Sequence, residues 1–279
     1  MFDFNKAASS TQAALEDTSK LELLLMGPSG AGKSYTIGTL GVKTLYLYGT
    51  RETHGYLTAR VQGKDCVIPM CIDYGQWPGE TANRAFTADE TLQFVRALLT
   101  SFDWIKESGF EAIALDGIAA LEVIVKDSTE WKAKCKTSQG KHNSFKESEA
   151  SSEILGGIVN LLKGCQRELG VHIIATAPLE IKDQDGFGGI TEAMPRLAGY
   201  GVAEAIVANF GDILVVGKMT KGTDVRWRFQ SLMDIKKVAK DENGTIKRIL
   251  NFSPRLSGAS LPITMEADLS KVIAMKAKK

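Results

Sequence analysis

A mostly parallel, doubly wound α/β sheet is the fold class that this sequence predicts, on three observations. Apolar runs of strand length alternate with segments of helical periodicity, and the runs lie at 21–26, 43–48, 66–72, 110–115 and 171–177. The first run leads straight into a glycine-rich turn at 27–34, and the run at 110–115 ends in an acid, Asp116. Strands and helices that alternate in this way are typical of parallel sheets covered by helices on both faces.

The first elements are defined by their breaks and their periodicity. A helix that begins near Lys33 is expected to be short, because Gly38 and Gly41 interrupt it. Pro69 places the run at 66–72 at a sheet edge or a bulge, since proline cannot donate to a strand ladder. The segment 88–107 predicts one helix, because its apolar side chains recur at helical spacing: Leu92, Val95, Leu98, Leu99 and Phe102.

The second half of the chain is less regular. Residues 126–152 and 180–201 predict two irregular regions, the first rich in lysine and the second in glycine. A helix at 154–169 and a buried strand at 171–177 separate them, and a strand at 213–216 follows. Asn243-Gly244, between 225–235 and 245–252, is a strong hairpin signal. We therefore divide the chain into an arm at 1–20, a core at 21–235 and a C-terminal hairpin strand and basic tail at 236–279.

The composition indicates a globular protein without a strong charge bias. The 279 residues carry 34 Lys and Arg against 33 Asp and Glu, so any surface for nucleic acid must be local. The start of the chain lacks the pattern of a secretory signal, and no apolar stretch approaches membrane-spanning length. The four cysteines form no CxxC pair and the chain has only three histidines, which disfavours zinc and predicts buried or free thiols in a reducing cytoplasm.

The turn at 27–34 matches the phosphate-loop pattern G-x-x-x-x-G-K-[ST] directly after a strand. Small residues let main-chain N–H groups surround a phosphate, and the helix that follows directs its positive end at the same group. Lys33 would contact the β- and γ-phosphates and Ser34 would ligate Mg²⁺. A chance glycine-rich turn is the other interpretation, which the full match disfavours. We expect ATP and Mg²⁺ as cofactors, bound by Gly27, Pro28, Ser29, Gly30, Ala31, Gly32, Lys33, Ser34 and Tyr35.

Asp116 ends the apolar strand at 110–115 and is the second candidate for the metal site. From the end of a neighbouring strand its carboxylate would hold Mg²⁺ through water, which completes a Walker A and Walker B pair. The other interpretation is an aspartate that caps the next helix.

The segment 113–121, which reads IALDGIAAL, resembles the Walker B strand of RecA-like ATPases. The order of phosphate loop, short helix, KTLYLY strand, Walker B strand, irregular insert and VHIIATAP strand is similar to the compact bacteriophage branch of that superfamily. The resemblance covers about residues 20–235. It implies a RecA-like ATP-binding core, associated with single-strand annealing and recombination, in the host cytoplasm if the chain is phage-encoded.

The resemblance also implies catalytic roles. A RecA-like glutamate that orients the attacking water matches Glu52, which otherwise is a solvated loop acid, and Asp73 is the reserve candidate. A polar sensor at the strand tip before the second DNA loop matches Thr176, in place of the more usual Gln, Asn or His. With Lys33 and Asp116, these are the catalytic candidates.

The two irregular regions match the positions of DNA-binding loops in recombinases. Binding of a single strand needs cations for the backbone and flat side chains for stacking. The candidates in the first region are Trp131, Lys132, Lys134, Lys136, Lys141, His142, Phe145 and Lys146, and those in the second are Lys182, Phe187 and Arg196. An ordinary solvated insert and a mobile loop are equally good interpretations, because acids dilute the first region. The four lysines at 271–279 fit a soluble end or further phosphate contacts.

ATPases of this kind often place nucleotide between subunits, with a cation supplied by the neighbour. The candidates for that cation are Arg196, Lys218, Lys221, Arg226 and Arg228. We expect a slow ATPase that forms a ring or filament with itself and engages single-stranded DNA, with a single-strand-binding or recombination protein as a further partner. Two alternatives are an ATP-dependent scaffold or switch that acts on a protein partner, and a nucleoside or nucleotide kinase. The insert lacks the arginines that a kinase lid usually carries.

Overall fold

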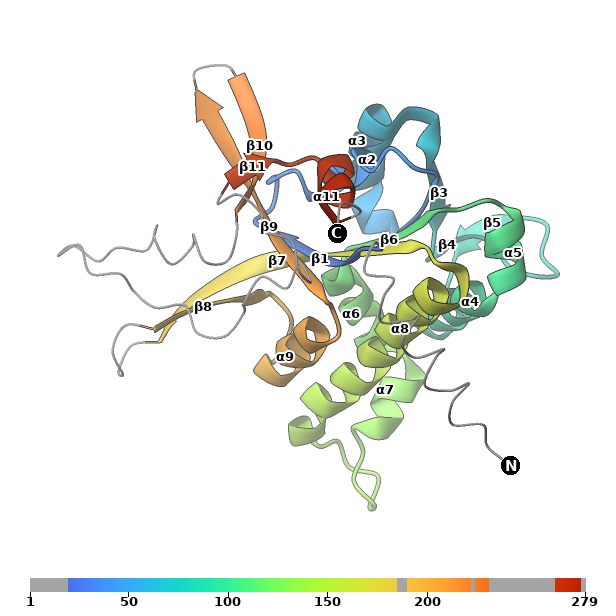
Figure 1. Ribbon diagram of the computed structural model, residues 1–279. Coiled ribbons are helices and arrows are strands. Elements are labelled where there is room, and N and C mark those ends of the chain that lie inside the picture. The colour runs from blue at the N-terminus through green and yellow to red at the C-terminus, as the bar shows by residue number, and fades with distance from the viewer. Residues whose placement is uncertain (1–19, 185–189, 222–223, 231–263, 277–279) are drawn as a thin grey trace, which may run out of the picture.

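The computed structural model describes residues 20–184, 190–221, 224–230 and 264–276. A nine-stranded sheet runs through its centre in the order β11-β10-β9-β1-β7-β6-β2-β3, with β8 paired to β7 (Figure 1). The parallel strands are β1 (Glu22–Gly27), β2 (Thr44–Tyr48), β3 (Val67–Cys71), β6 (Ala112–Asp116), β7 (His172–Gln184) and β9 (Asp212–Lys221). The antiparallel strands are β8 (Ile190–Pro195), β10 (Asp224–Gln230) and β11 (Thr264–Glu266).

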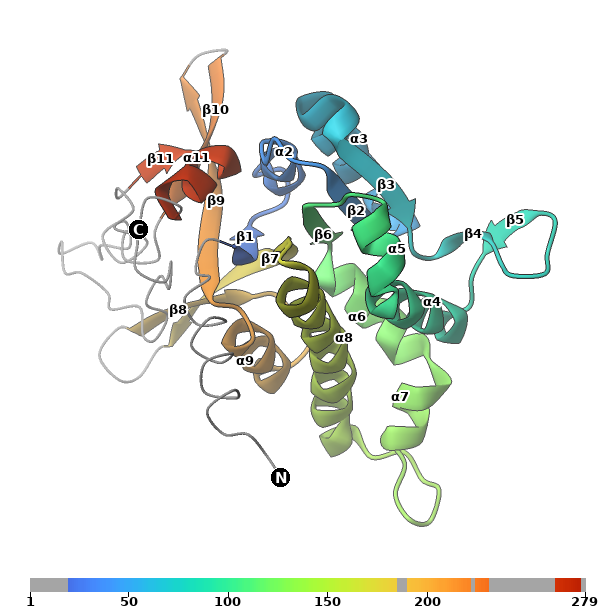
Figure 2. The same ribbon diagram turned by 45° about the vertical axis from the view of Figure 1, so that its right-hand side comes forward.

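Helices cover both faces of this sheet, which confirms the predicted fold class (Figure 2). One face carries α2 (Lys33–Gly38), α3 (Thr53–Gly63) and α11 (Leu269–Lys276). The other face carries α4 (Ala88–Thr100), α6 (Ile118–Asp127), α7 (Thr129–Lys134), α8 (Glu147–Leu169) and α9 (Tyr200–Ala208). Helix α5 (Phe102–Glu107) lies at the end of this face. A small hairpin of β4 (Tyr74–Gln76) and β5 (Asn83–Ala85) precedes α4. No helix among the described residues has the length and apolar character needed to cross a bilayer.

Alternating side chains of the strands feed two apolar cores. On β1, Leu23 and Leu25 face the core under α2, α3 and α11, whereas Leu24 and Met26 face the core under the other helices. All four are at most 1% exposed, so the strand that carries the phosphate loop is buried on both sides. Burying a side chain of this size contributes roughly 1.5–3 kcal/mol, so the loop starts from a rigid base.

Several element boundaries differ from the sequence-based expectation. The segment 88–107 forms two helices, because Ser101 leaves helical geometry and interrupts the run. The strand at 66–72 is β3, at the end of the sheet order, as Pro69 predicts. The turn at Asn243-Gly244 and its second flank lie outside the described residues.

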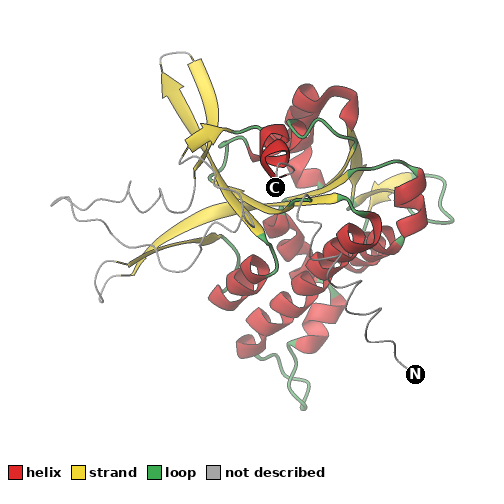
Figure 3. Cartoon of the chain, viewed as in Figure 1, coloured by secondary structure: helices red, strands yellow, loops and turns green. Residues whose placement is uncertain are grey.

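The two regions predicted to be irregular are largely ordered. Helix α7, a 3₁₀ turn at Ser144–Lys146 and the first six residues of α8 occupy more than half of 126–152, and residues 135–143 join α7 to the 3₁₀ turn (Figure 3). In the second region β7 continues to Gln184 and pairs antiparallel with β8, from Leu179↔Pro195 to Gln184↔Ile190. The glycine and acid content of these regions made them look irregular in the sequence. The helix caps and cross-strand contacts that order them leave no periodic pattern of apolar residues.

β1 lies between β7 and β9, and both neighbours extend past the end of β1. Gly27 is the last residue of β1 and pairs with Pro178, after which β7 runs on for six residues to Gln184. β9 pairs with β1 up to Val215 and continues to Lys221, where it pairs with β10. The phosphate loop therefore sits between two projecting hairpins, β7–β8 and β9–β10 (Figure 1).

Candidate functional site

The phosphate loop joins β1 to α2, and its conformation depends on glycine. Gly30 and Gly32 have φ angles of 72° and 92°, in the left-handed region that other residues rarely adopt. Gly27 packs against β9 so closely that an added Cβ would lie 2.6 Å from the carbonyl oxygen of Val216. The loop is therefore held in one shape by backbone geometry and by contact with its neighbouring strand.

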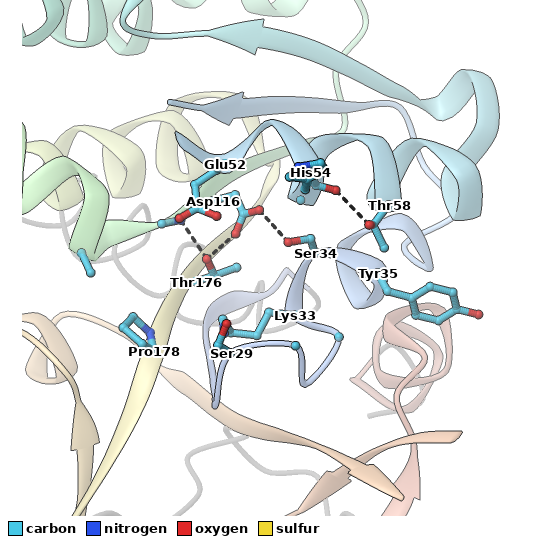
Figure 4. A pocket seen from close by; sticks show the side chains of 15 residues that line it. Ser29, Lys33, Ser34, Tyr35, Glu52, His54, Thr58, Asp116, Thr176 and Pro178 are labelled. Carbon is cyan, nitrogen blue, oxygen red and sulfur yellow. Dashed lines mark hydrogen bonds between the residues drawn. The ribbon is translucent and has the colours of Figure 1, made fainter. Parts of the chain in front are cut away.

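A cavity of about 480 Å³ opens beside this loop and brings together residues from four separate segments of the chain (Figure 4). The lining residues are Ser29, Gly30, Gly32, Lys33, Ser34, Tyr35, Glu52, His54, Gly55, Thr58, Asp116, Gly117, Ala119, Thr176 and Pro178. All four candidate catalytic residues, Lys33, Glu52, Asp116 and Thr176, line this one cavity. Tyr35 points away from the loop at the rim (Figure 4).

Asp116 is the centre of a hydrogen-bond network. Its Oδ2 accepts from Ser34 Oγ at 2.7 Å and from the phenol of Tyr46, and its Oδ1 accepts from Thr176 Oγ1. The main-chain N–H of Gly117 donates to Thr176 Oγ1 at 2.8 Å. Only 4% of Asp116 is exposed, and its carboxylate is held by hydroxyl donors from α2, β2 and β7.

The oxygen atoms of Ser34 and Asp116 fit a magnesium site. A hydroxyl and a carboxylate are the ligand types that Mg²⁺ takes from phosphate-loop proteins, where it keeps several waters. The 2.7 Å contact between Ser34 Oγ and Asp116 Oδ2 brings these two groups to one point. Ser34 and Asp116 are therefore the residues that would hold Mg²⁺, with Asp116 acting through water.

Lys33 lies along the phosphate loop. Its Nζ donates to the carbonyl oxygens of Gly27 and Pro28 at 2.9 and 3.1 Å. Burial lowers the pKa of Lys33, and the negative charges of Asp116 and Glu52 oppose that shift. A cation aligned along the loop is placed to meet phosphate oxygens.

Glu52 ends a short 3₁₀ turn, Thr50–Glu52, that follows β2. The turn places its side chain beside Asp116 and next to Gly117, whose added Cβ would lie 3.4 Å from Glu52 Oε1 (Figure 4). Burial raises the pKa of Glu52, the charge of Asp116 raises it further, and Lys33 lowers it. A carboxylate of raised pKa in the cavity can act as a general base near neutral pH.

The start of α3 covers the Ser34–Asp116 pair, which the sequence did not indicate. A Cβ added to Gly55 would lie 2.7 Å from both Ser34 Oγ and Asp116 Oδ2. His54 and Thr58 line the same side of the cavity. The absence of a side chain at Gly55 thus leaves room for these two polar groups. A single glycine in a polar segment does not predict such a contact from the sequence.

No protein-family model matches the chain, and no curated protein matches it either. Among solved structures, the chain is similar to the KaiC-like protein PH0186 from the archaeon Pyrococcus horikoshii OT3. The two share 15% sequence identity at a TM-score of 0.37, over 75% of this chain and 77% of that protein. A likeness this distant carries no functional argument, so the assignment of the site depends on its own geometry.

Asp73, the reserve candidate for the catalytic acid, lies outside the cavity. Its carboxylate accepts from the main-chain N–H and the hydroxyl of Thr50, at 2.8 and 3.0 Å. It also accepts from the thiol of Cys71 at 3.2 Å. Asp73 therefore holds the turn that carries Glu52, which is a supporting role.

The first candidate DNA region needs correction at one residue, Trp131. Trp131 is 8% exposed within α7, and its Nε1 donates to Ser151 Oγ at 2.9 Å, so this indole is part of the core and cannot stack on a base. Lys134 forms an ion pair with Glu153 at 2.7 Å. The remaining candidates there are exposed, namely Lys132, Lys136, Lys141, His142, Phe145 and Lys146.

The described candidates of the second region lie on β7 or just after β8, and the neighbour-directed cations other than Arg196 lie on β9 and β10. Lys182 is in β7, Arg196 is exposed just after β8, and Phe187 lies outside the described residues. Lys218 and Lys221 are in β9, and Arg226 and Arg228 are in β10. In the basic tail, Lys276 is buried against Asp212 at 2.7 Å, so it cannot contact phosphate.

Proposed function

We propose that the protein is a RecA-like P-loop ATPase that binds ATP with Mg²⁺ and hydrolyses it slowly. We further propose that it assembles with itself as a ring or filament and acts on single-stranded DNA in recombination or repair, as the resemblance to the bacteriophage branch implies. The observation that carries the ATPase assignment is one cavity that combines a glycine-held phosphate loop, Lys33, the Ser34–Asp116 pair and Glu52. Bound Mg²⁺ would neutralise phosphate charge at that pair.

Each side chain of the site has a separate task in this proposal. The amides of the loop and Lys33 hold the phosphates, and Thr176 and Tyr46 keep the Asp116 carboxylate in one orientation. Glu52 accepts a proton from the attacking water. A cation from β9 or β10 of a second copy would complete the charge balance, because these strands project beside the phosphate loop.

Backbone contacts link the site to the β7–β8 hairpin. They support the proposal that nucleotide binding at the site changes the position of the hairpin. Pro178 lines the cavity, and its carbonyl accepts from the N–H of Arg196 at 2.7 Å. The N–H of Ala198 donates to both carboxylate oxygens of Glu122 at 3.0 Å, and Glu122 is on α6, which follows Asp116 directly. Both strands of the hairpin are thus anchored to elements that start at the site.

The DNA part of the proposal is tested by ATP turnover and by binding. Saturating single-stranded DNA is expected to raise turnover and to form a complex at low salt, and Lys33→Ala is expected to remove turnover. A protein that binds and turns over ATP but responds to no single-stranded DNA in either assay would contradict the DNA role and leave the ATPase standing.

Phe145 gives a sharper test of the first DNA region. Its side chain is 94% exposed in the 3₁₀ turn Ser144–Lys146 before α8, and the exposed Lys136, Lys141 and Lys146 belong to the same connection between α7 and α8. Stacking on an aromatic is worth about 1–3 kcal/mol per base, so Phe145→Ala is expected to weaken single-strand binding by about 5- to 150-fold. The measurement is fluorescence anisotropy of a labelled oligonucleotide, with Tyr74→Ala on the β4 strand as the exposed-aromatic control. Equal affinity in both variants would exclude this loop from the DNA surface.

One observation favours a nucleotide-dependent switch as the second candidate. The Thr176 hydroxyl is engaged by Asp116 and by Gly117, so at this strand tip it has no free donor for the γ-phosphate. In a switch, nucleotide binding alone drives assembly with a protein partner. Lys33→Ala would then abolish assembly, and loss of hydrolysis would leave it intact.

A further inference from the structure

Tyr46 stands out among the residues that contact the site because neither a motif nor a loop brings it there. It lies in the middle of β2, next to the Walker B strand, in register with Ala114. Its side chain is 0% exposed, and its phenol donates to Asp116 Oδ2, the same atom that accepts from Ser34. Tyr46 therefore fills space in the core and also makes a polar contact with the carboxylate oxygen that faces the metal site.

The Asp116 carboxylate is restrained on every described side. Thr176 holds Oδ1, Ser34 and Tyr46 hold Oδ2, and the backbone of Gly55 leaves no room for even a methyl group above that oxygen. Because Ser34 is itself assigned to the metal, Tyr46 is the donor on Oδ2 that is free to act as a permanent anchor. Without it, only Thr176 would keep the carboxylate from rotating about its Cβ–Cγ bond.

We propose that Tyr46 is a positioning residue that fixes the Walker B carboxylate and thereby sets the affinity of the nucleotide site for Mg²⁺. This inference rests on the proposed ATPase function. It assigns to β2 a polar contribution to the metal site, in addition to its place in the sheet. Tyr46 is not among the residues that line the cavity, so it acts through Asp116.

Tyr48 supplies a matched comparison within the same strand. The rings of Tyr46 and Tyr48 lie 6.1 Å apart, and each packs near Tyr56 of α3, at 6.1 and 5.1 Å. Burial is the main cause that raises the pKa of each phenol; among the acids, Asp116 and Glu52 raise the pKa of Tyr46, whereas Asp73 raises the pKa of Tyr48. Removing either hydroxyl leaves the aromatic cluster in place, but only the removal of the Tyr46 hydroxyl takes a hydrogen bond from Asp116.

The experiment compares Tyr46→Phe, Tyr48→Phe and the unchanged protein by anisotropy of a fluorescent ATP analogue during a Mg²⁺ titration. A hydrogen bond to a charged group is worth enough that Tyr46→Phe is expected to raise the Mg²⁺ midpoint about tenfold. Tyr48→Phe is expected to stay within about twofold, because its phenol makes no bond to Asp116. Electron paramagnetic resonance of bound Mn²⁺ gives the same comparison without hydrolysis.

The outcomes separate the inference from the function on which it rests. Superimposable titrations for all three proteins would overturn the role of Tyr46 and leave the ATPase standing. An unchanged protein that binds no analogue at any Mg²⁺ concentration would overturn the function, and the inference with it. If Tyr46→Phe does not fold, 3-fluorotyrosine at position 46 replaces it. A ¹⁹F resonance that moves with Mg²⁺ only when ATP is present supports the role, and one that does not move overturns it.

Discussion

Glu52→Gln is expected to reduce ATP turnover by about 10²- to 10⁴-fold, the usual contribution of a general base. The amide keeps the shape of the side chain in the cavity but cannot take a proton from water. ATP affinity is expected to remain equal or to become tighter, because a negative charge near the phosphates is removed while Lys33 stays. Single-turnover hydrolysis and equilibrium binding of ATP measure the two effects separately.

The pH dependence of turnover provides an independent test of the same residue. The base must be ionised, so turnover rises as pH increases through the pKa of Glu52. Burial and the charge of Asp116 raise that pKa above the ordinary 4.5, which moves the acidic limb of the profile upward. The glutamine variant is expected to lose this limb, since its residual rate has no such group to titrate.

Glu107→Gln is the matched control, because Glu107 is exposed at the end of α5 and is not among the residues that line the cavity. It is expected to retain the turnover and the pH profile of the unchanged protein. If Glu52→Gln hydrolyses ATP at an undiminished rate, Glu52 is only a loop acid. If Glu52→Gln instead loses hydrolysis but still assembles, and Lys33→Ala does not assemble, the nucleotide-dependent switch is the better function.

The phosphate loop and Asp116 could be predicted from the sequence, because each is identified by a short run of consecutive residues. Glycines at fixed offsets, a lysine and a serine after an apolar strand leave few alternatives. Glu52 was reached only through the resemblance, and the structure places it in the cavity through a 3₁₀ turn held by Asp73. Its catalytic role stays a prediction.

The residues that the sequence did not indicate act across long separations. Tyr46 meets Asp116 70 positions away, and Gly55 fits against it only because α3 folds back over the loop. Trp131 was misassigned because an aromatic among lysines matches a stacking platform as well as a helix anchor. Its partner Ser151, 20 positions on, decides between the two. Such pairings depend on tertiary packing, which local periodicity does not encode.

The C-terminal helix α11 contributes a lysine, Lys276, to a buried ion pair. In the sequence this lysine is part of a basic tail. Lys276 Nζ contacts Asp212 Oδ2 at 2.7 Å, and the two side chains are 3% and 1% exposed. The same ammonium donates to the carbonyl of Lys20 at 2.9 Å, and Asp212 also accepts from the N–H of Glu22. The pair therefore joins α11 to the starts of β1 and β9.

Lys276→Ala is expected to destabilise the fold by about 3–5 kcal/mol, because it removes the cation that faces a buried carboxylate. The free energy of unfolding, from urea denaturation followed by circular dichroism, measures this. Lys271→Ala on the same helix is the control, since its side chain is 51% exposed and its contact to Asp268 is 3.7 Å. A change within about 1 kcal/mol is expected there.

A double variant separates the charge from the packing. Lys276→Met with Asp212→Asn removes both charges, keeps an acceptor for the N–H of Glu22 and fills the space of the lysine stem. Replacing both members of a buried pair is often close to neutral, so most of the lost stability is expected to return. If Lys276→Ala alone costs no more than Lys271→Ala, α11 is not anchored by this pair. Its apolar contacts through Leu269 and Val272 would then hold it in place.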